Sequence, residues 1–255
     1  MTLSKLIIAA FAFAAAGAAH ATIVTAQDNF SIVNSGSGWN DAWTLAPAKP
    51  NKVAPATLSN SALVFAGNSD NAAVRELAAT QASDVFVDFT LQYSGVLGGN
   101  DFVGLWFGDW NGPSIGLKAN CGNTSSATTC TNDLFVRTSG SDGYFLTGSN
   151  LEAGKSYQVF GHLYKSTDKD SAYYDRFSAW FQPTGTDLTS AVVTAKGKSS
   201  LTSFDTLGFR SANIDNKVTV AIDDLRVANV PEPGSFALMG LALAGLFAAR
   251  RRKQG

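Results

Sequence analysis

Residues 84–93 alternate between an apolar face and a largely polar one. The apolar residues share one face of an extended chain: Val85, Val87, Phe89, Leu91 and Tyr93. Such period-two alternation predicts a β-strand with one buried face. Residues 101–107 are instead apolar on both faces, which predicts a central strand that is covered on each side.

Other segments show the same extended pattern more briefly. They predict strands at residues 62–66, 114–118, 134–137, 155–164, 173–181, 205–210 and 217–228. Proline and Gly-Ser or Gly-Asn clusters separate these segments at the spacing of an antiparallel sandwich. Only residues 72–82 have a composition that allows a helical turn or two, and no repeat or internal linker divides the chain. The pattern therefore predicts one all-β domain, an antiparallel β-sandwich.

The last predicted strand changes phase once. Its first apolar residues are Val218, Val220 and Ile222, and its later ones are Leu225 and Val227. Because side chains alternate with a period of two, a change of phase needs one extra residue. The sequence therefore predicts a β-bulge at Asp223 and Asp224.

The two ends of the chain carry apolar segments of another kind. Residues 235–249 are apolar around the whole helical circumference and precede a basic stop: Arg250, Arg251, Arg252 and Lys253. As a helix they span roughly 22 Å, against a hydrocarbon core of about 30 Å. The positive-inside rule places the basic end in the cytoplasm and the domain on the far side of the membrane. We therefore predict a single transmembrane helix here, since a core or amphipathic helix would need a polar face.

Pro231, Glu232 and Pro233 stand just before this apolar run. A Pro-Glu-Pro motif, an apolar run and an arginine cluster, in this order, resemble the PEP-CTERM sorting signal of Gram-negative bacteria that make exopolysaccharide. In that family an intramembrane transpeptidase-like enzyme, exosortase, recognises the signal and is thought to cut near the motif. The resemblance implies that the three motif residues are recognised by exosortase, and that the product reaches the cell envelope or the extracellular space.

Proline suits such a motif because it fixes φ and removes an amide donor, which keeps the segment extended and unpaired. The alternative is a rigid linker before a plain membrane anchor. Either interpretation leaves the domain outside the same membrane.

The first 21 residues have the form of a secretory signal peptide for the Sec export machinery. Lys5 precedes an apolar stretch at residues 6–16, and Ala19 and Ala21 form an Ala-x-Ala cleavage site. The expected division is a signal peptide at 1–21, a β-sandwich domain at 22–229 and a sorting signal at 230–255.

Removing both end segments changes the charge. They contain five of the 19 Lys and Arg residues and one of the 20 Asp and Glu residues, so 14 cations face 19 acids, a net charge of −5. Without a basic stripe, nucleic acid is not expected as a partner. Abundant small polar residues suit a secreted β protein with many turns.

Cys121 and Cys130 are the only cysteines, and a Gly-, Ser- and Thr-rich loop separates them. Export places them in an oxidising compartment, so we predict one disulfide that pins this loop. A free redox pair is the alternative.

Three stretches of the domain have a second resemblance. Asp28-Asn29-Phe30, the segment 102–107 and the segment 220–227 resemble parts of the concanavalin A-like jelly roll of laminin-G and lectin domains. The resemblance implies that the first and last strands pair. That family includes sugar binders, adhesive modules and glycoside hydrolases, so three functions stay open: a noncatalytic, polysaccharide-binding envelope or matrix protein, a secreted glycan-active enzyme, and a purely structural adhesion component.

Glycoside hydrolases of this architecture place acids at alternate positions of one strand, so that two carboxylates flank the glycosidic bond. The domain has only two glutamates, Glu76 and Glu152, and neither lies in such a run. The sequence therefore favours a noncatalytic protein.

Residues 112–116 match Gly-x-Ser-x-Gly, the nucleophile elbow of α/β-hydrolases, and His162 follows downstream. An elbow needs a strand before it and a helix after it. Here a Gly-Pro turn leads into a short alternating segment, so Ser114 is predicted to open a strand instead.

Trp110, Asp109 and Asn111 form the best candidate for ligand binding. Sugars pack on flat aromatic faces, and flanking Asp and Asn side chains satisfy their hydroxyls. The alternative is that Trp110 caps the core, as Trp106 is expected to do.

No cofactor is expected, and the domain has too few histidines and cysteines for a zinc site. Calcium needs only oxygen ligands, and Asp28 near the first strand and Asp223 on the last are its candidates. A solvated turn is the alternative for both.

Overall fold

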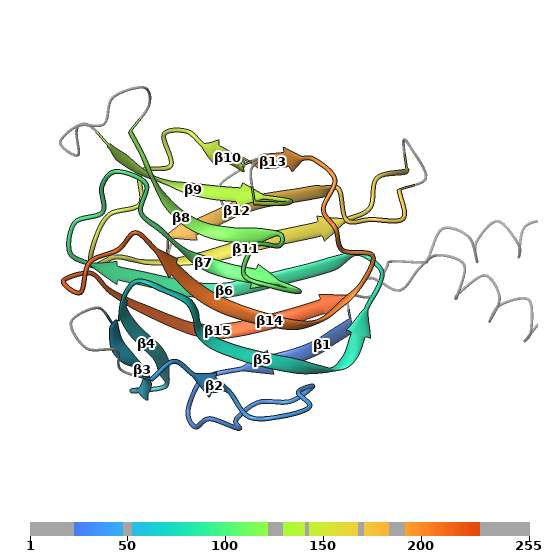
Figure 1. Cartoon of the computed structure of the whole chain (residues 1–255), viewed down its shortest axis with the longest axis horizontal. Helices are drawn as coiled ribbons and strands as arrows, with labels where there is room; N and C mark the ends of the chain where they lie inside the picture. Colours follow the sequence, from blue (N-terminus) through green and yellow to red (C-terminus); the bar gives the residue numbers. More distant parts are fainter. Residues whose placement is uncertain are drawn as a thin grey trace, which may run out of the picture. The chain divides into compact units, whose positions relative to one another are not determined.

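The computed structural model describes residues 23–47, 53–121, 130–140, 143–167, 171–183 and 192–229. Every regular element among these residues is a β-strand. The strands form two antiparallel sheets stacked as two layers, with the strands of both running in roughly the same direction (Figure 1). This confirms the predicted all-β antiparallel sandwich.

The sheets have eight and seven strands. In spatial order the eight-stranded sheet contains β13 (Val193–Lys196), β12 (Arg176–Pro183), β11 (Ser156–Tyr164), β6 (Val85–Ser94), β15 (Thr219–Asn229), β4 (Ala62–Gly67) and β3 (Val53–Ser59), with β1 (Ile23–Asp28) also paired to β15. The seven-stranded sheet contains β10 (Gly143–Leu146), β9 (Thr131–Arg137), β8 (Ser114–Asn120), β7 (Phe102–Phe107), β14 (Phe204–Ala212), β5 (Ser69–Gln81) and β2 (Thr44–Leu45). The first and last strands thus pair, as the jelly-roll resemblance implied.

The core lies between the two sheets and follows the alternation in the sequence. In β6 the five predicted inward residues are all buried. All six residues of β7 are buried, and this strand is the middle one of its sheet. Val103, Leu105 and Phe107 enter the core, while Phe102 and Trp106 are covered on the outer face by other side chains. The prediction of a central strand covered on both sides is confirmed.

The predicted bulge is present in β15. Asp223 pairs with Thr90 of β6, but Arg226 pairs with Asp88, so β15 advances three residues where β6 advances two. Asp224 takes the extra position with a φ of 49°. Ile222 and Leu225 are therefore both fully buried despite the odd spacing between them.

The prediction that residues 72–82 could form a helical turn is wrong. This stretch belongs to β5, which pairs with β14 on one side and with β2 on the other. Alanine, glutamate and leucine favour helices only weakly, and pairing within a sheet overrides that preference. The buried residues Ala73, Arg75 and Leu77 show the period of two that the alanines concealed.

A buried ion pair joins the two sheets. Arg75 of β5 contacts the carboxylate of Asp28 in β1, and both side chains are almost completely buried. The Asp28 carboxylate also accepts hydrogen bonds from Trp43 Nε1 at 2.9 Å, from the Phe30 amide at 2.7 Å and from Ser35 Oγ at 2.5 Å. Asp28, one of the two candidate calcium ligands, is thus paired with Arg75, and the other, Asp223, lies at the bulge.

The predicted disulfide between Cys121 and Cys130 is confirmed.

No helix in the part of the chain that the structure describes is long and apolar enough to cross a membrane. The expected sorting helix at 235–249 lies outside the described residues.

Candidate ligand-binding site

Four neighbouring strands of the seven-stranded sheet direct charged and aromatic side chains to its outer face. In β7, β8, β9 and β14, residues that alternate with the core positions point away from the other sheet. They include Phe102, Lys118, Arg137 and Arg210, none of which belongs to the core cluster. Phe102 lies directly opposite Lys118 on one neighbouring strand and opposite Ala212 on the other.

These side chains surround a cavity of about 260 Å³, which we call the outer pocket. The residues that line it are Asn68, Asp70, Asn100, Phe102, Lys118, Phe135, Arg137, Arg210, Ala212 and Asn213. The pocket therefore combines amides, aromatic rings and charged groups.

Aromatic rings form the floor of the outer pocket. Phe102 and Phe135 meet edge to face with ring centroids 5.8 Å apart, and each is 6% exposed. Phe145 extends the cluster, since its ring centroid lies 5.1 Å from that of Phe135. Such packed rings hold the floor in place.

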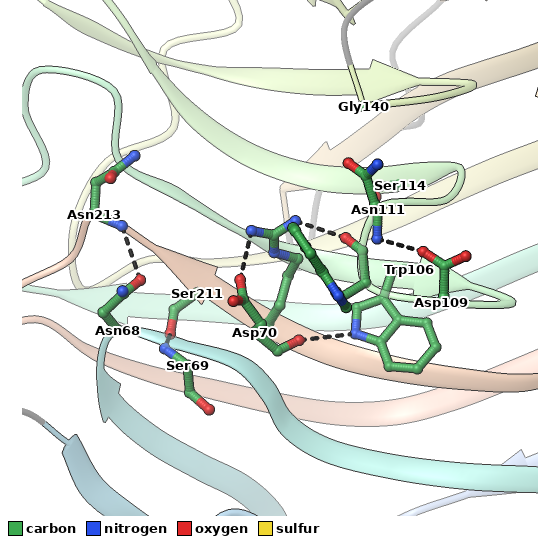
Figure 2. Close-up of polar contacts among 12 residues, drawn as sticks. Asn68, Ser69, Asp70, Trp106, Asp109, Asn111, Ser114, Gly140, Ser211 and Asn213 are labelled. Carbon is green, nitrogen blue, oxygen red and sulfur yellow. Dashed lines mark hydrogen bonds and ion pairs between the residues drawn. The ribbon is translucent and has the colours of Figure 1, made fainter. Parts of the chain in front are cut away.

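Amide side chains connect the loops at the rim. The backbone amide of Asn213 donates to Asn68 Oδ1 at 3.0 Å, as Figure 2 shows. Asn213 Nδ2 donates to the Asn100 carbonyl at 2.9 Å. All three residues are exposed, so the amide groups that these bonds leave unused face solvent.

Arg210 ties the turn after β7 to the pocket. Its Nη1 donates to the Trp110 carbonyl at 2.6 Å, and its Nη2 donates to Asp70 Oδ1 at 2.7 Å. Its guanidinium carbon lies 5.1 Å from the centroid of the Trp110 ring. Burial lowers the pKa of Arg210, and the charge of Asp70 opposes that shift.

Arg137 and Lys118 extend the positive charge across the pocket. Arg137 donates to three neutral oxygens, Ser114 Oγ at 3.3 Å and the carbonyls of Gly140 and Trp110 at 3.2 and 3.3 Å. Burial and the nearby charge of Arg210 lower the pKa of Arg137 to about 10. Lys118 Nζ lies 4.9 Å from the centroid of Phe135, and burial followed by the charge of Arg137 lowers its pKa. Arg137 therefore stays protonated at neutral pH.

The nearby carboxylates already have partners. Asp70, the only acid that lines the pocket, is ion-paired with Arg210. Asp133 lies opposite Lys118 in the sheet. It accepts four hydrogen bonds, from Asn120 Nδ2, Thr131 Oγ1, Ser149 Oγ and the Asn150 amide. In the described part of the chain, Arg137 and Lys118 therefore have no carboxylate within ion-pair distance.

The three predicted ligand residues lie in the turn beside this pocket. Trp110 is 45% exposed, so it does not cap the core. Asp109 Oδ1 accepts from the Asn111 amide at 2.7 Å, which closes the turn rather than leaving that oxygen free (Figure 2). A side chain at Gly140 would collide with the amide of Asn111, so that amide packs against the 138–140 segment. Among the three, Trp110 thus presents the contact surface.

Trp106 is 3% exposed, and its Nε1 donates to the Asp70 carbonyl at 3.2 Å (Figure 2). Trp106 is therefore buried as expected, but it covers the outer face of its sheet and is not part of the core between the sheets. The pocket residues Phe102, Lys118, Arg137 and Arg210 were not predicted. Their sequence signal is a cation or ring at an alternate position of an otherwise apolar strand.

The Gly-x-Ser-x-Gly segment does not form a nucleophile elbow. Ser114 is buried at the start of β8, and its Oγ donates to the Gly112 carbonyl at 3.0 Å. His162 lies in β11 of the other sheet, where its Nε2 is 3.1 Å from Asp84 Oδ2. As predicted, Ser114 opens a strand.

Several predicted residues lie outside the described part of the chain. They are Ala19 and Ala21 of the signal peptide, Pro231, Glu232 and Pro233 of the sorting motif, and Arg250, Arg251, Arg252 and Lys253 of the basic stop. Their assignment rests on the sequence.

Residues 229–253 match the family model of the PEP-CTERM protein-sorting motif. This protein is therefore an exported β-sandwich protein with a PEP-CTERM sorting signal. The signal implies transient anchoring in the membrane and processing by exosortase, with the cell envelope or the extracellular space as destination. No curated protein sequence matches the chain.

Solved structures that are similar to this one in backbone fold include a glycoside hydrolase, a lyase and a lectin. A xylan β-1,4-xylosidase from Bacillus halodurans C-125 is 14% identical with a TM-score of 0.49, and the match covers 79% of this chain but only 38% of the xylosidase. An alginate lyase from Alteromonas sp. 272 is 10% identical with a TM-score of 0.45, covering 74% of this chain and 95% of the lyase. Peanut lectin is 11% identical with a TM-score of 0.43, covering 73% and 95%.

Proposed function

We propose that the domain at residues 22–229 is a noncatalytic, polysaccharide-binding protein of the cell envelope or extracellular matrix. The outer pocket and the adjacent ring of Trp110 are its sugar-binding surface. The observation that carries this proposal is the exposed indole of Trp110 beside a hollow lined by amides and aromatic rings.

The chemistry of the surface suits a sugar chain. An indole face packs against the C–H groups of a pyranose ring, while amides and guanidinium groups donate to its hydroxyls. Arg137 and Arg210 hold Trp110 through its backbone carbonyl. The turn is therefore fixed before a ligand arrives, which reduces the entropy lost on binding.

The acids of the domain argue against glycoside hydrolysis, which needs two carboxylates on either side of the scissile bond. Glu152 is exposed and pairs with Lys155, and the backbone of Glu76 is bound to Asp41. Neither glutamate lines the pocket, whose one acid is neutralised by Arg210. Incubation with the same polysaccharides and measurement of new reducing or unsaturated ends tests the alternative of a glycan-active enzyme.

Trp110→Ala is expected to weaken polysaccharide binding about tenfold to hundredfold, because it removes about 1.5–3 kcal/mol of apolar contact. A panel of purified polysaccharides in affinity electrophoresis measures the effect, and thermal unfolding verifies that the variant folds. Tyr144→Ala is the matched control, since Tyr144 is 44% exposed on the same sheet but does not line the pocket. Equal binding by Trp110→Ala and the wild type, or no binding to any polysaccharide, would contradict the proposal and leave a structural component.

A further inference from the structure

The charges of the outer pocket are not balanced. Three cations line it, Lys118, Arg137 and Arg210, against the single acid Asp70. Asp70 lies 2.7 Å from Arg210, and the four donors to Asp133 hold that carboxylate in its own network. Within the described residues, Lys118 and Arg137 thus have no carboxylate within ion-pair distance, and the attraction of Asp109 on Arg137 is weaker than the opposing effects of burial and of Arg210.

This arrangement is costly for the protein without a ligand. Arg137 and Lys118 are partly withdrawn from water, and each lies near another cation. Desolvation and like-charge repulsion both disfavour the charged forms, and the lowered pKa of each group expresses that cost. A nearby anion would relieve both effects, so this cluster has the character of a binding site.

The unused hydrogen-bond donors point to the same kind of ligand. Arg137 has five N–H groups, and the three neutral oxygens that it contacts leave some of them free. No hydrogen bond to another described residue is found for Lys118 Nζ, which lies above the rings of Phe135 and Phe145. A guanidinium fork pairs best with a planar oxyanion, and an ammonium group strengthens that attraction as a point charge.

We propose that the outer pocket selects acidic polysaccharides, whose uronate carboxylates bind Arg137 and Lys118 while the sugar ring packs near Trp110. This assignment rests on the proposed function and adds the chemical class of the ligand. Arg210, already paired with Asp70, is a positioning residue that holds the Trp110 turn.

The test compares charged and neutral forms of the same polymers. Binding of the processed protein to polygalacturonate and to alginate is measured by calorimetry, and again after chemical reduction of their carboxyl groups. We expect at least tenfold tighter binding to the acidic forms, with an affinity that falls as salt rises. Dextran sulfate separates carboxylate recognition from attraction to any polyanion.

The variants separate the pocket from general electrostatics. Lys118→Met combined with Arg137→Met is expected to weaken binding to the acidic polymers at least thirtyfold and to leave the reduced polymers unaffected. The control is Lys196→Met combined with Lys198→Met, which removes the same charge from exposed positions near Arg176, away from the outer pocket. It should change binding less than twofold. Lys118→Met alone serves if loss of Arg137 prevents folding, because the Lys118 ammonium group contacts only aromatic rings among the residues that the structure describes.

Each contrary outcome has one meaning. Equal affinity for acidic and reduced polymers would overturn acid selection and leave polysaccharide binding intact. An equal loss of affinity for the acidic polymers in the pocket variant and in the control variant would overturn uronate recognition at this pocket. The same conclusion would follow if dextran sulfate bound more tightly than the uronate polymers and the pocket variant abolished that binding. Failure to bind any polymer, acidic or neutral, would overturn the proposed function itself.

Discussion

Arg75→Ala is expected to lower the free energy of unfolding by about 3–5 kcal/mol, because it leaves the buried carboxylate of Asp28 without its counterion. Asp28 is 3% exposed, so water solvates the carboxylate poorly in place of the guanidinium. The arginine also donates to the carbonyls of Asp41 and Ser35 at 2.7 and 2.8 Å. Its guanidinium carbon lies 4.8 Å from the ring centroid of Trp39, so packing is lost as well.

Chemical denaturation followed by tryptophan fluorescence measures this change. Lys155→Ala is the matched control, because Lys155 forms an ion pair with Glu152 at 2.9 Å in which both side chains are 59% exposed. Water and salt already screen that pair, so little change is expected. If Arg75→Ala and Lys155→Ala had the same denaturation midpoint, the buried ion pair would not stabilise the packing of the two sheets.

The second large effect concerns the sorting signal. Replacing Pro231, Glu232 and Pro233 with alanines is expected to abolish processing, because exosortase then meets no Pro-Glu-Pro motif. The wild-type protein, isolated from its own cells, should begin at Thr22, end near Pro233 and lie outside the inner membrane. The variant should retain residues 250–253 and stay in that membrane. Intact-mass measurement of each cell fraction determines both the ends of the chain and its location.

Gln254→Ala, which keeps the motif and the basic stop, should be processed normally. Wild-type protein that keeps its basic end in the inner membrane would contradict sorting by exosortase. The domain would then be attached to the membrane by a simple anchor.

The interior strands were predictable because their alternation is strong. β6 and β7 lie inside their sheets and are dense in large apolar residues. The strands that were not predicted include β3, β10 and β13, which lie at sheet edges. Edge strands bury less surface and have one unpaired side, so their sequences carry a weaker pattern. At β5, alanine hid the period because its side chain marks neither face strongly.

The ligand-binding site was predictable only where its residues are contiguous. Trp110 stands in a Gly-, Asp- and Asn-containing turn, and that local pattern indicated an exposed ring. Phe102, Lys118, Arg137 and Arg210 are brought together by the pairing of β7 with β8 and β14 and of β8 with β9. The net charge of −5 gave no sign of a cationic pocket, since net charge does not report how charges cluster in space.

The pairing of β15 sets an order in time. This strand lies between β6 and β4 and also pairs with β1. Each of these three earlier strands therefore lacks one pairing partner until β15 has been synthesised. A chain made from its N-terminus therefore cannot complete this sheet until residue 229 has been synthesised. Pro231 follows only two residues later. A chain that ends before residue 229 thus lacks part of β15 and also the sorting motif.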